Sequence, residues 1–379
     1  MQFELDADQT ALQESLRRFF SREYDFELRR GFLASPHGTS ASIWQSLAEQ
    51  GALAIAIPEE HGGFGGPVET MLVMEEIGRA LVLEPYLSTV VLCASLLAAR
   101  GRPEQQAEWL GRIAAGNCKL ALAHSEPDAR YELHFIGTKA RASGDHYLLN
   151  GVKSTVLDGA VADCFLVSAR LQPRAEVAVF LVDAQAAGLE RVSYRTQDGR
   201  TAADLTLRDV KVPRTNLLGD ESHAMASIER SVERGIAALC AEAVGAIEAV
   251  NHATLEYTKS RKQFGQPIAR FQALQHRMAD MFVLATQARS MALLATGRCN
   301  TEDAAVRRHD ISAAKAFIGK AARFVGQQAV QLHGGMGIAD ELSVSHYFKR
   351  LTMIGVTFGD IDHHVATISN AILAEGQVS

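Results

Sequence analysis

The spacing of apolar residues changes twice along this chain of 379 residues, and this change limits the possible folds more than any other feature. Up to about residue 117 apolar residues recur every three or four positions, as Leu12 and Leu16 do, which is typical of helices. From 118 to 219 they alternate, as in strands, and from 220 the helical spacing returns. We therefore predict an α+β protein with an N-terminal all-α domain (1–117), a middle β-barrel or sandwich domain (118–219) and a C-terminal four-helix bundle (220–379).

Local signals refine this outline. Asp6 followed by Gln9 predicts a capped helix start, and further helices are predicted over 43–49, 68–80, 86–99 and 103–115. In the middle region, Gly144-Asp145 precedes the alternating run His146-Tyr-Leu-Leu, and Asn150-Gly151 is the strongest short hairpin signal.

Composition excludes several functions. With 38 Lys+Arg against 44 Asp+Glu the net charge is −6, which gives no support to nucleic-acid binding. No run reaches the 18 or so apolar residues of a membrane span, and the N-terminal residues show no secretory pattern. The five cysteines lie far apart without metal-ligand spacing. We expect a cytoplasmic protein without a membrane span or a bound metal.

Two clusters in the last third could carry chemistry. Arg261-Lys-Gln-Phe264-Gly265 follows a long helix, and an arginine beside a flexible glycine suits bidentate recognition of a phosphate. Gln331-Leu-His333-Gly334-Gly335 combines a side-chain amide with glycines that allow close approach of a ligand. Each cluster alone also fits an ordinary helix end.

Together, and behind a β region, the two clusters resemble the acyl-CoA dehydrogenase family. Ile57-Pro-Glu-Glu-His-Gly-Gly63, Ser125-Glu-Pro127 and Asn150-Gly-Val-Lys153 match further landmarks, so the resemblance covers essentially the whole chain. It implies FAD as cofactor, an acyl-CoA thioester as substrate, the 2-enoyl-CoA as product and a flavoprotein as electron acceptor. The positions that it assigns to the cofactor are Arg261, Phe264, Gln272, Gln331, Gly334, Gly335 and Ser125. It places Arg261 and Phe264 against the cofactor of a neighbouring subunit.

The resemblance also implies a catalytic base, which this chain lacks at both usual positions. The first is 27 residues after Gln331, and it is Phe358. The second is ten residues before Gly245, and it is Gly235. The substitutes are weak: Glu233 lies about 200° around the helix from residue 235, and Glu242 lies about two turns downstream.

Other departures agree with a degenerate flavin-ring site. The usual run after Ser125-Glu-Pro127 is replaced by Asp-Ala-Arg-Tyr131, and Thr155-Val-Leu157 replaces a Trp-x-Thr. The segment Phe358-Gly-Asp-Ile-Asp-His-His364 favours a helix cap or subunit contact over a metal site.

These features are similar to the small, base-lacking subunit of heteromeric acyl-CoA dehydrogenases, of the pimeloyl-CoA dehydrogenase small-subunit type or the type in bacterial steroid side-chain degradation. We therefore expect a dehydrogenase subunit paired with a different, base-bearing subunit. Three alternatives stay open: a self-sufficient homo-oligomer with a displaced glutamate, a catalytically silent structural subunit, and a flavin oxidase or other chemistry on the same fold.

Overall fold

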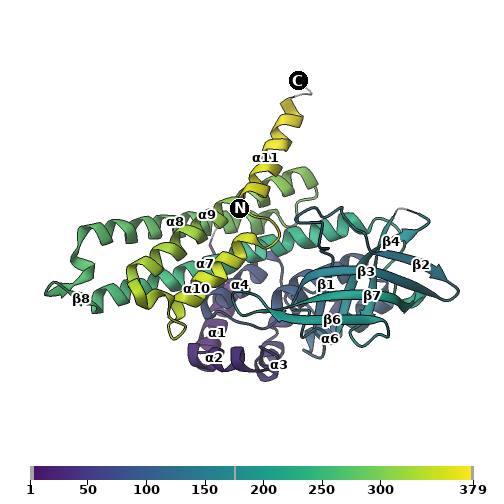
Figure 1. Cartoon of the computed structure of the whole chain (residues 1–379), viewed down its shortest axis with the longest axis horizontal. Helices are drawn as coiled ribbons and strands as arrows, with labels where there is room; N and C mark the ends of the chain where they lie inside the picture. Colours follow the sequence, from purple (N-terminus) through teal and green to yellow (C-terminus); the bar gives the residue numbers. More distant parts are fainter. Residues whose placement is uncertain (1–3, 175, 377–379) are drawn as a thin grey trace. The chain divides into compact units, whose positions relative to one another are not determined.

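The computed structural model describes residues 4–174 and 176–376. Their contacts group the chain into two compact units. The helical unit takes the chain up to Arg30, Pro67–Val82 and everything from Ile236, and the sheet unit takes Gly31–Gly66 and Leu83–Gly235 (Figure 1). Each unit is described separately, although two helices, α2 (Phe26–Ala34) and α7 (Ala224–Ser260), run from one unit into the other.

The helical unit begins with α1 (Ala7–Glu23), and the predicted cap is confirmed. The Asp6 carboxylate accepts from Gln9 N while the Gln9 side chain accepts from Asp6 N. This reciprocal pair satisfies two of the donors that a helix start leaves open. The other α-helices of this unit are α4 (Pro67–Ala80), the larger part of α7, α8 (Gln272–Arg298), α9 (Ala304–His333), α10 (Ser343–Val356) and α11 (Ile361–Gly376), and its 3-10 helices are η5 (Ile268–Arg270) and η6 (Gly334–Ile338).

Two glycines let α4 and α7 approach almost backbone to backbone. A Cβ on Gly78 would lie 1.9 Å from Glu242 O, and a Cβ on Gly245 would lie 1.8 Å from Glu75 O. Only glycine fits at such contacts. Gly245, from which the resemblance counts one of the usual base positions, is therefore also a packing requirement of this chain.

The helix α7 is long and apolar enough, by length and composition, to cross a membrane. In its most apolar window 72% is buried inside the protein, which is what a core helix of a globular protein also shows.

The strands of the sheet unit form one seven-stranded sheet, which is curled (Figure 1). The strand order is β1-β4-β2-β3-β7-β6, and β5 pairs with β4. The pairings of β4 with β1 and with β2 are parallel, and the others are antiparallel. The bounds are β1 (Leu120–Ala123), β2 (Lys139–Ser143), β3 (His146–Leu157), β4 (Cys164–Gln172), β5 (Val177–Asp183), β6 (Leu189–Arg195) and β7 (Thr201–Pro213).

The core of the sheet is built on the alternation that the sequence shows. Phe165, Phe180 and Leu205 are fully buried in one cluster, and the ring of Tyr147 meets that of Phe180 edge-on at 5.0 Å. Short helices complete this unit: α3 (Ala41–Glu49), η1 (Ala52–Ala54), η2 (Glu59–His61), the π-helix η3 (Leu87–Cys93), α5 (Ala94–Arg100), α6 (Pro103–Ala114) and η4 (Arg214–Asn216).

The hairpin predicted at Asn150-Gly151 is wrong. The turn between β2 and β3 is Gly144-Asp145, and Asn150-Gly151 lies inside β3 at a register shift against β7. The Asn150 amide bonds to Asp209, which holds the irregularity, and a Cβ on Gly151 would meet Thr138 at 2.5 Å. The pair therefore forms a bulge, the other common use of such residues within a strand.

Candidate functional site

The two sequence clusters of the helical unit lie at the same end of its bundle. Between them, the Tyr257 ring of α7 stacks on the His333 ring of α9, with centroids 4.2 Å apart and planes at 23°. The Tyr257 hydroxyl also donates to His333 O at 3.3 Å. This contact joins the ends of α7 and α9; the first cluster begins directly after α7, and the second begins in the last turn of α9 with Gln331. Tyr257 and His333, which are 76 positions apart in the sequence, thus bring the two clusters together. We call the region formed by the clusters Arg261–Gly265 and Gln331–Gly335 the bundle-end site.

A short hairpin presents the first half of the bundle-end site. Strands β8 (Lys262–Gln263) and β9 (Gln266–Pro267) pair, and Ile268 N donates to Arg261 O at 2.9 Å. At its tip Phe264 has φ +53° and Gly265 has φ +81°. The Phe264 ring is 90% exposed and meets the Phe271 ring edge-on.

The second half is an open backbone turn. Gly334 has φ +59°, and a Cβ built on Gly334 or Gly335 would meet nothing within 4 Å, so a ligand could lie directly on this backbone. Gly337 differs, because its Cβ would strike Val330 O at 2.5 Å and its role is packing. The side chains of Arg261, Gln272 and Gln331 are all exposed.

These residues fit the phosphate and adenosine part of a dinucleotide. Among the described residues no hydrogen bond or ion pair of the Arg261 guanidinium is found, so its charge is open to an anion. The Gln331 amide can donate and accept, and the Phe264 ring offers a face for stacking. Arg261, Phe264, Gln272, Gln331, Gly334 and Gly335 are therefore brought to one end of the helical unit.

Ser125 belongs to the sheet unit. It follows β1 and is exposed between buried His124 and buried Glu126. Its backbone carbonyl accepts from Ser154 N of β3 at 2.9 Å.

Neither usual base position can accept a proton from its side chain. Gly235 is buried in α7, and Phe358 is half-buried in the turn between α10 and α11 with φ +59°. The buried ammonium of Lys315 holds this turn by donating to Gly359 O at 2.8 Å and to Gly355 O at 3.3 Å. Burial lowers the pKa of Lys315 to about 8.

The two substitute glutamates differ in surroundings. Both oxygens of Glu242 accept from Arg350 of α10, each at 2.6 Å, and both side chains are buried. A carboxylate bound in this way has little freedom to take a proton from a substrate. Glu233 is 6% exposed on α7, inside the sheet unit.

The histidine-rich segment after Phe358 forms the start of α11. The Asp360 carboxylate accepts from His363 N at 2.9 Å, and His364 Nδ1 lies 3.2 Å from Ser312 Oγ. In the part of the chain that the structure describes, no three His, Cys, Asp or Glu side chains are grouped to hold a metal ion.

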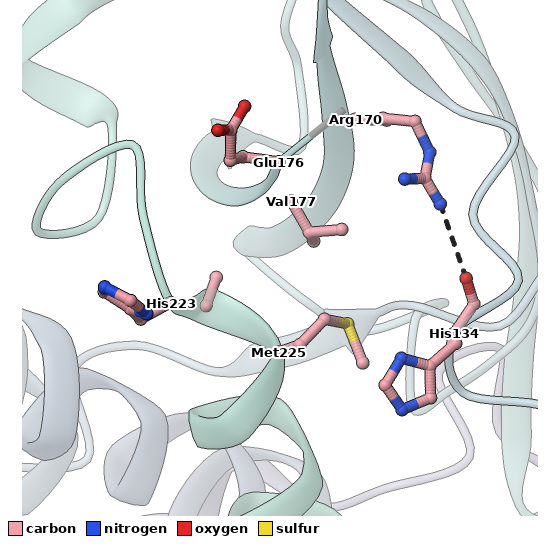
Figure 2. Close-up of a pocket in the computed structure, with 7 residues that line it drawn as sticks. His134, Arg170, Glu176, Val177, His223 and Met225 are labelled. Atoms are coloured by element: carbon pink, nitrogen blue, oxygen red, sulfur yellow. Dashed lines mark hydrogen bonds between the residues drawn. The ribbon is translucent and has the colours of Figure 1, made fainter. Parts of the chain in front are cut away.

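The sheet unit also contains an open pocket of about 320 Å³ that sequence reasoning missed (Figure 2). Its lining comes from separate segments that no sequence signal connects: His134, Arg170, Glu176, Val177, His223, Ala224 and Met225. The Arg170 guanidinium points toward His134 O at 3.5 Å, and Glu176 lies on another side of the pocket. The lining contains one arginine and one glutamate, whose opposite charges offset each other. The charge of the pocket therefore does not favour a ligand that carries a phosphate.

Comparison with known proteins shows the family. Family models for the N-terminal, middle and C-terminal domains of acyl-CoA dehydrogenases match residues 6–117, 121–210 and 225–373. The chain belongs to the acyl-CoA dehydrogenase family, which is a family of oxidoreductases. Its members depend on FAD, and one solved relative is an FAD complex.

Three relatives are informative. The probable acyl-CoA dehydrogenase YngJ of Bacillus subtilis is 30% identical, covering 98% of this chain and 100% of that protein. A solved variant of the Tcur3481-Tcur3483 steroid ACAD is 28% identical with a TM-score of 0.88, covering 98% of this chain and 99% of that one. A chain in the structure of the ChsE4-ChsE5 complex of Mycobacterium tuberculosis is 26% identical with a TM-score of 0.88 and the same coverage.

Proposed function

We propose that this chain is one subunit of a FAD-dependent acyl-CoA dehydrogenase whose catalytic base comes from a different subunit. The observation that carries the proposal is the contrast between two sites in this chain. The bundle-end site keeps an open arginine, an exposed glutamine and two open glycines. The base position is Phe358, and Glu242 is bound to Arg350.

The bundle-end site would hold the part of FAD that does not react. Arg261 would bind the pyrophosphate, Gln331 would bond to the adenine side, and the backbone of Gly334 and Gly335 would allow close approach. When bound, FAD supplies the hydride acceptor for oxidation of the bond between the α and β carbons of the thioester. The α proton must go to a carboxylate within hydrogen-bond reach, which we assign to the partner subunit.

Two relatives support the partner and the substrate class. The names ChsE4-ChsE5 and Tcur3481-Tcur3483 each describe two different proteins together, and the second is titled a steroid ACAD. We propose a heteromer of this kind, with a bulky CoA thioester such as a steroid-derived or dicarboxylyl one.

A self-sufficient homo-oligomer with a displaced base is the main alternative. It requires Glu233 or Glu242 to act as the base, so Glu233→Gln or Glu242→Gln should abolish turnover. Activity that survives both changes excludes this alternative. A silent structural subunit is disfavoured because a scaffold has little physical need for an open arginine beside two open glycines.

The test is a flavin stoichiometry on the purified chain, followed by anaerobic titration with acyl-CoAs. We expect little flavin, or flavin that stays oxidised with substrate, until the partner subunit is added. Full flavin that is reduced by an acyl-CoA in the chain alone would overturn the proposal. Oxygen consumption on the same substrates would reveal an oxidase.

A further inference from the structure

The exposed Ser125 lies between two buried residues that contact one buried lysine. Lys153 of β3 is 0% exposed, and its ammonium donates to His124 O at 3.1 Å and to Glu126 Oε1 at 2.8 Å. The residue after this lysine, Ser154, bonds to the carbonyl of Ser125 itself. The backbone before, at and after Ser125 is therefore tied to β3.

The lysine is fully satisfied in this position. Its third bond goes to Ser168 Oγ of β4 at 3.1 Å, so all three ammonium donors have acceptors. A buried ammonium is costly unless it is paired and hydrogen-bonded, and this one is both. The bonds to Glu126, Ser168 and the backbone thus hold it in one place.

The network has one consistent direction of donation. Leu133 O accepts from His124 Nε2 at 2.9 Å, which makes His124 Nδ1 the acceptor for the hydroxyl of Ser168 at 2.9 Å. Ser168 Oγ in turn accepts from Lys153. His124 is neutral in this arrangement, and burial lowers its pKa to about 4.

Glu126 extends the network to the far end of the same loop. Its carboxylate accepts from Gly137 N at 2.7 Å, Thr138 N at 3.0 Å and Thr138 Oγ1 at 2.7 Å. The 124–138 loop is therefore closed at both ends onto the Lys153–Glu126 pair, and Ser125 projects from the closed end.

We propose that Lys153 is a positioning residue that holds Ser125 where it meets the cofactor. The proposal rests on the proposed function, because it takes from the family resemblance that Ser125 contacts the cofactor. Lys153 is buried beneath the loop and acts through Ser125.

The first test measures the loop without any ligand. In Lys153→Met, amide hydrogen exchange in the 124–138 loop should become at least tenfold faster, while the other strands stay protected. Lys139→Met is the matched control, because Lys139 is exposed on β2 of the same sheet. Unchanged exchange in the loop of a folded Lys153→Met protein would overturn the positioning role. If Lys153→Met does not fold, Lys153→Gln, which removes the charge but keeps hydrogen-bond donors and leaves Glu126 in place, is measured instead.

The second test links the loop to FAD. The dissociation constant of FAD, measured by flavin fluorescence with the partner subunit present, should rise about tenfold in Lys153→Met and in Ser125→Ala. The double variant should bind FAD no more weakly than either single variant, because both changes act through one contact. Additive losses, or unchanged FAD binding in Lys153→Met, would overturn the proposal. A parent protein that binds no FAD with any partner would refute the proposed function, while the exchange measurement still decides the role of Lys153.

Discussion

At the scale of single residues, burial determines what each charged side chain can do. Glu242 and Arg350 form a closed, buried pair, whereas Arg261 is exposed and no bond of its guanidinium is found among the described residues. Charges of the first kind fix the structure, and those of the second kind are open to a ligand. Glu242 therefore lies near a usual base position in the sequence but is held by Arg350, whereas Arg261 can bind a ligand.

Glu242→Gln should therefore destabilise the protein. The change leaves the buried Arg350 without its counter-charge, which costs about 3 kcal/mol of unfolding free energy. Denaturant unfolding measures this loss. Glu256→Gln is the control on the same helix, because Glu256 and Lys259 pair at 2.8 Å with both side chains 55% exposed, and we expect no measurable change there. A stable Glu242→Gln protein that has lost all turnover would instead identify Glu242 as the base.

Acid should destabilise the fold through its buried histidines. Burial lowers the pKa of His124 to about 4 and that of His364 to about 3, against 6.5 when exposed. Below pH 6.5 the unfolded chain binds protons that the folded chain does not, so stability falls as the pH drops from 6.5 to about 4. Burial raises the pKa of Glu75 to about 7. Between pH 7 and 4.5 the folded chain therefore binds a proton that the unfolded chain does not, so Glu75 increases the stability of the fold as the pH drops through this range.

Denaturant unfolding across this pH range, compared with His364→Gln, isolates the histidine contribution. The variant should show a flatter dependence between pH 6.5 and 4, since one titrating group is gone. An unchanged slope would mean that the pKa of His364 is the same in the folded and the unfolded protein.

At the scale of elements, the crossing of α4 and α7 depends on Gly78 and Gly245. Gly245→Ala should destabilise the protein by roughly 1–3 kcal/mol, because its Cβ would lie 1.8 Å from the Glu75 carbonyl and the helices must separate.

Gly355→Ala in α10 provides the opposite expectation. A Cβ there meets nothing within 4 Å, and alanine favours a helix over glycine by about 1 kcal/mol. The midpoint of thermal unfolding should therefore fall in Gly245→Ala and rise in Gly355→Ala. A Gly245→Ala protein as stable as Gly355→Ala would show that the crossing adapts without cost.

The elements also show what can be predicted from sequence. A helix start such as the one at Asp6 depends on residues close by in the sequence, so the sequence pattern is sufficient to predict it. The pair Asn150-Gly151 suggests a turn when only its neighbours along the chain are considered. It forms a bulge because Asn150 bonds to Asp209, which is 59 residues away in the sequence. The π-helix over Leu87–Cys93 and the pocket around Arg170 likewise depend on distant packing. The bundle-end residues can be found because they occur in two compact motifs.

At the scale of the whole molecule, large apolar side chains are exposed in the helical unit. Phe264 is 90%, Ile338 73% and Phe282 69% exposed. Single exposed apolar residues are ordinary, but three large ones in one unit suit coverage by another subunit.

Phe282→Ser should weaken association while leaving the fold intact. We expect a lower mass by light scattering at equal concentration, with an unchanged thermal midpoint. Val192→Ser is the control, because Val192 is 56% exposed but lies on β6 in the sheet unit. Equal effects of the two changes would indicate nonspecific stickiness rather than a subunit contact.

The division of the helical unit along the chain has a consequence for synthesis. During translation α1 and α4 leave the ribosome first, but α4 packs against parts of α7 and α8 that emerge only after Leu83–Gly235 has been made. At typical rates this interval is on the order of ten seconds. The sheet unit can close in that time, whereas the eight consecutive residues Met71–Gly78, all buried in the finished protein, must wait. Chaperones should therefore bind the N-terminal helices of nascent chains of this protein. Chains released from ribosomes that stop before α8 should be unfolded in α1 and α4.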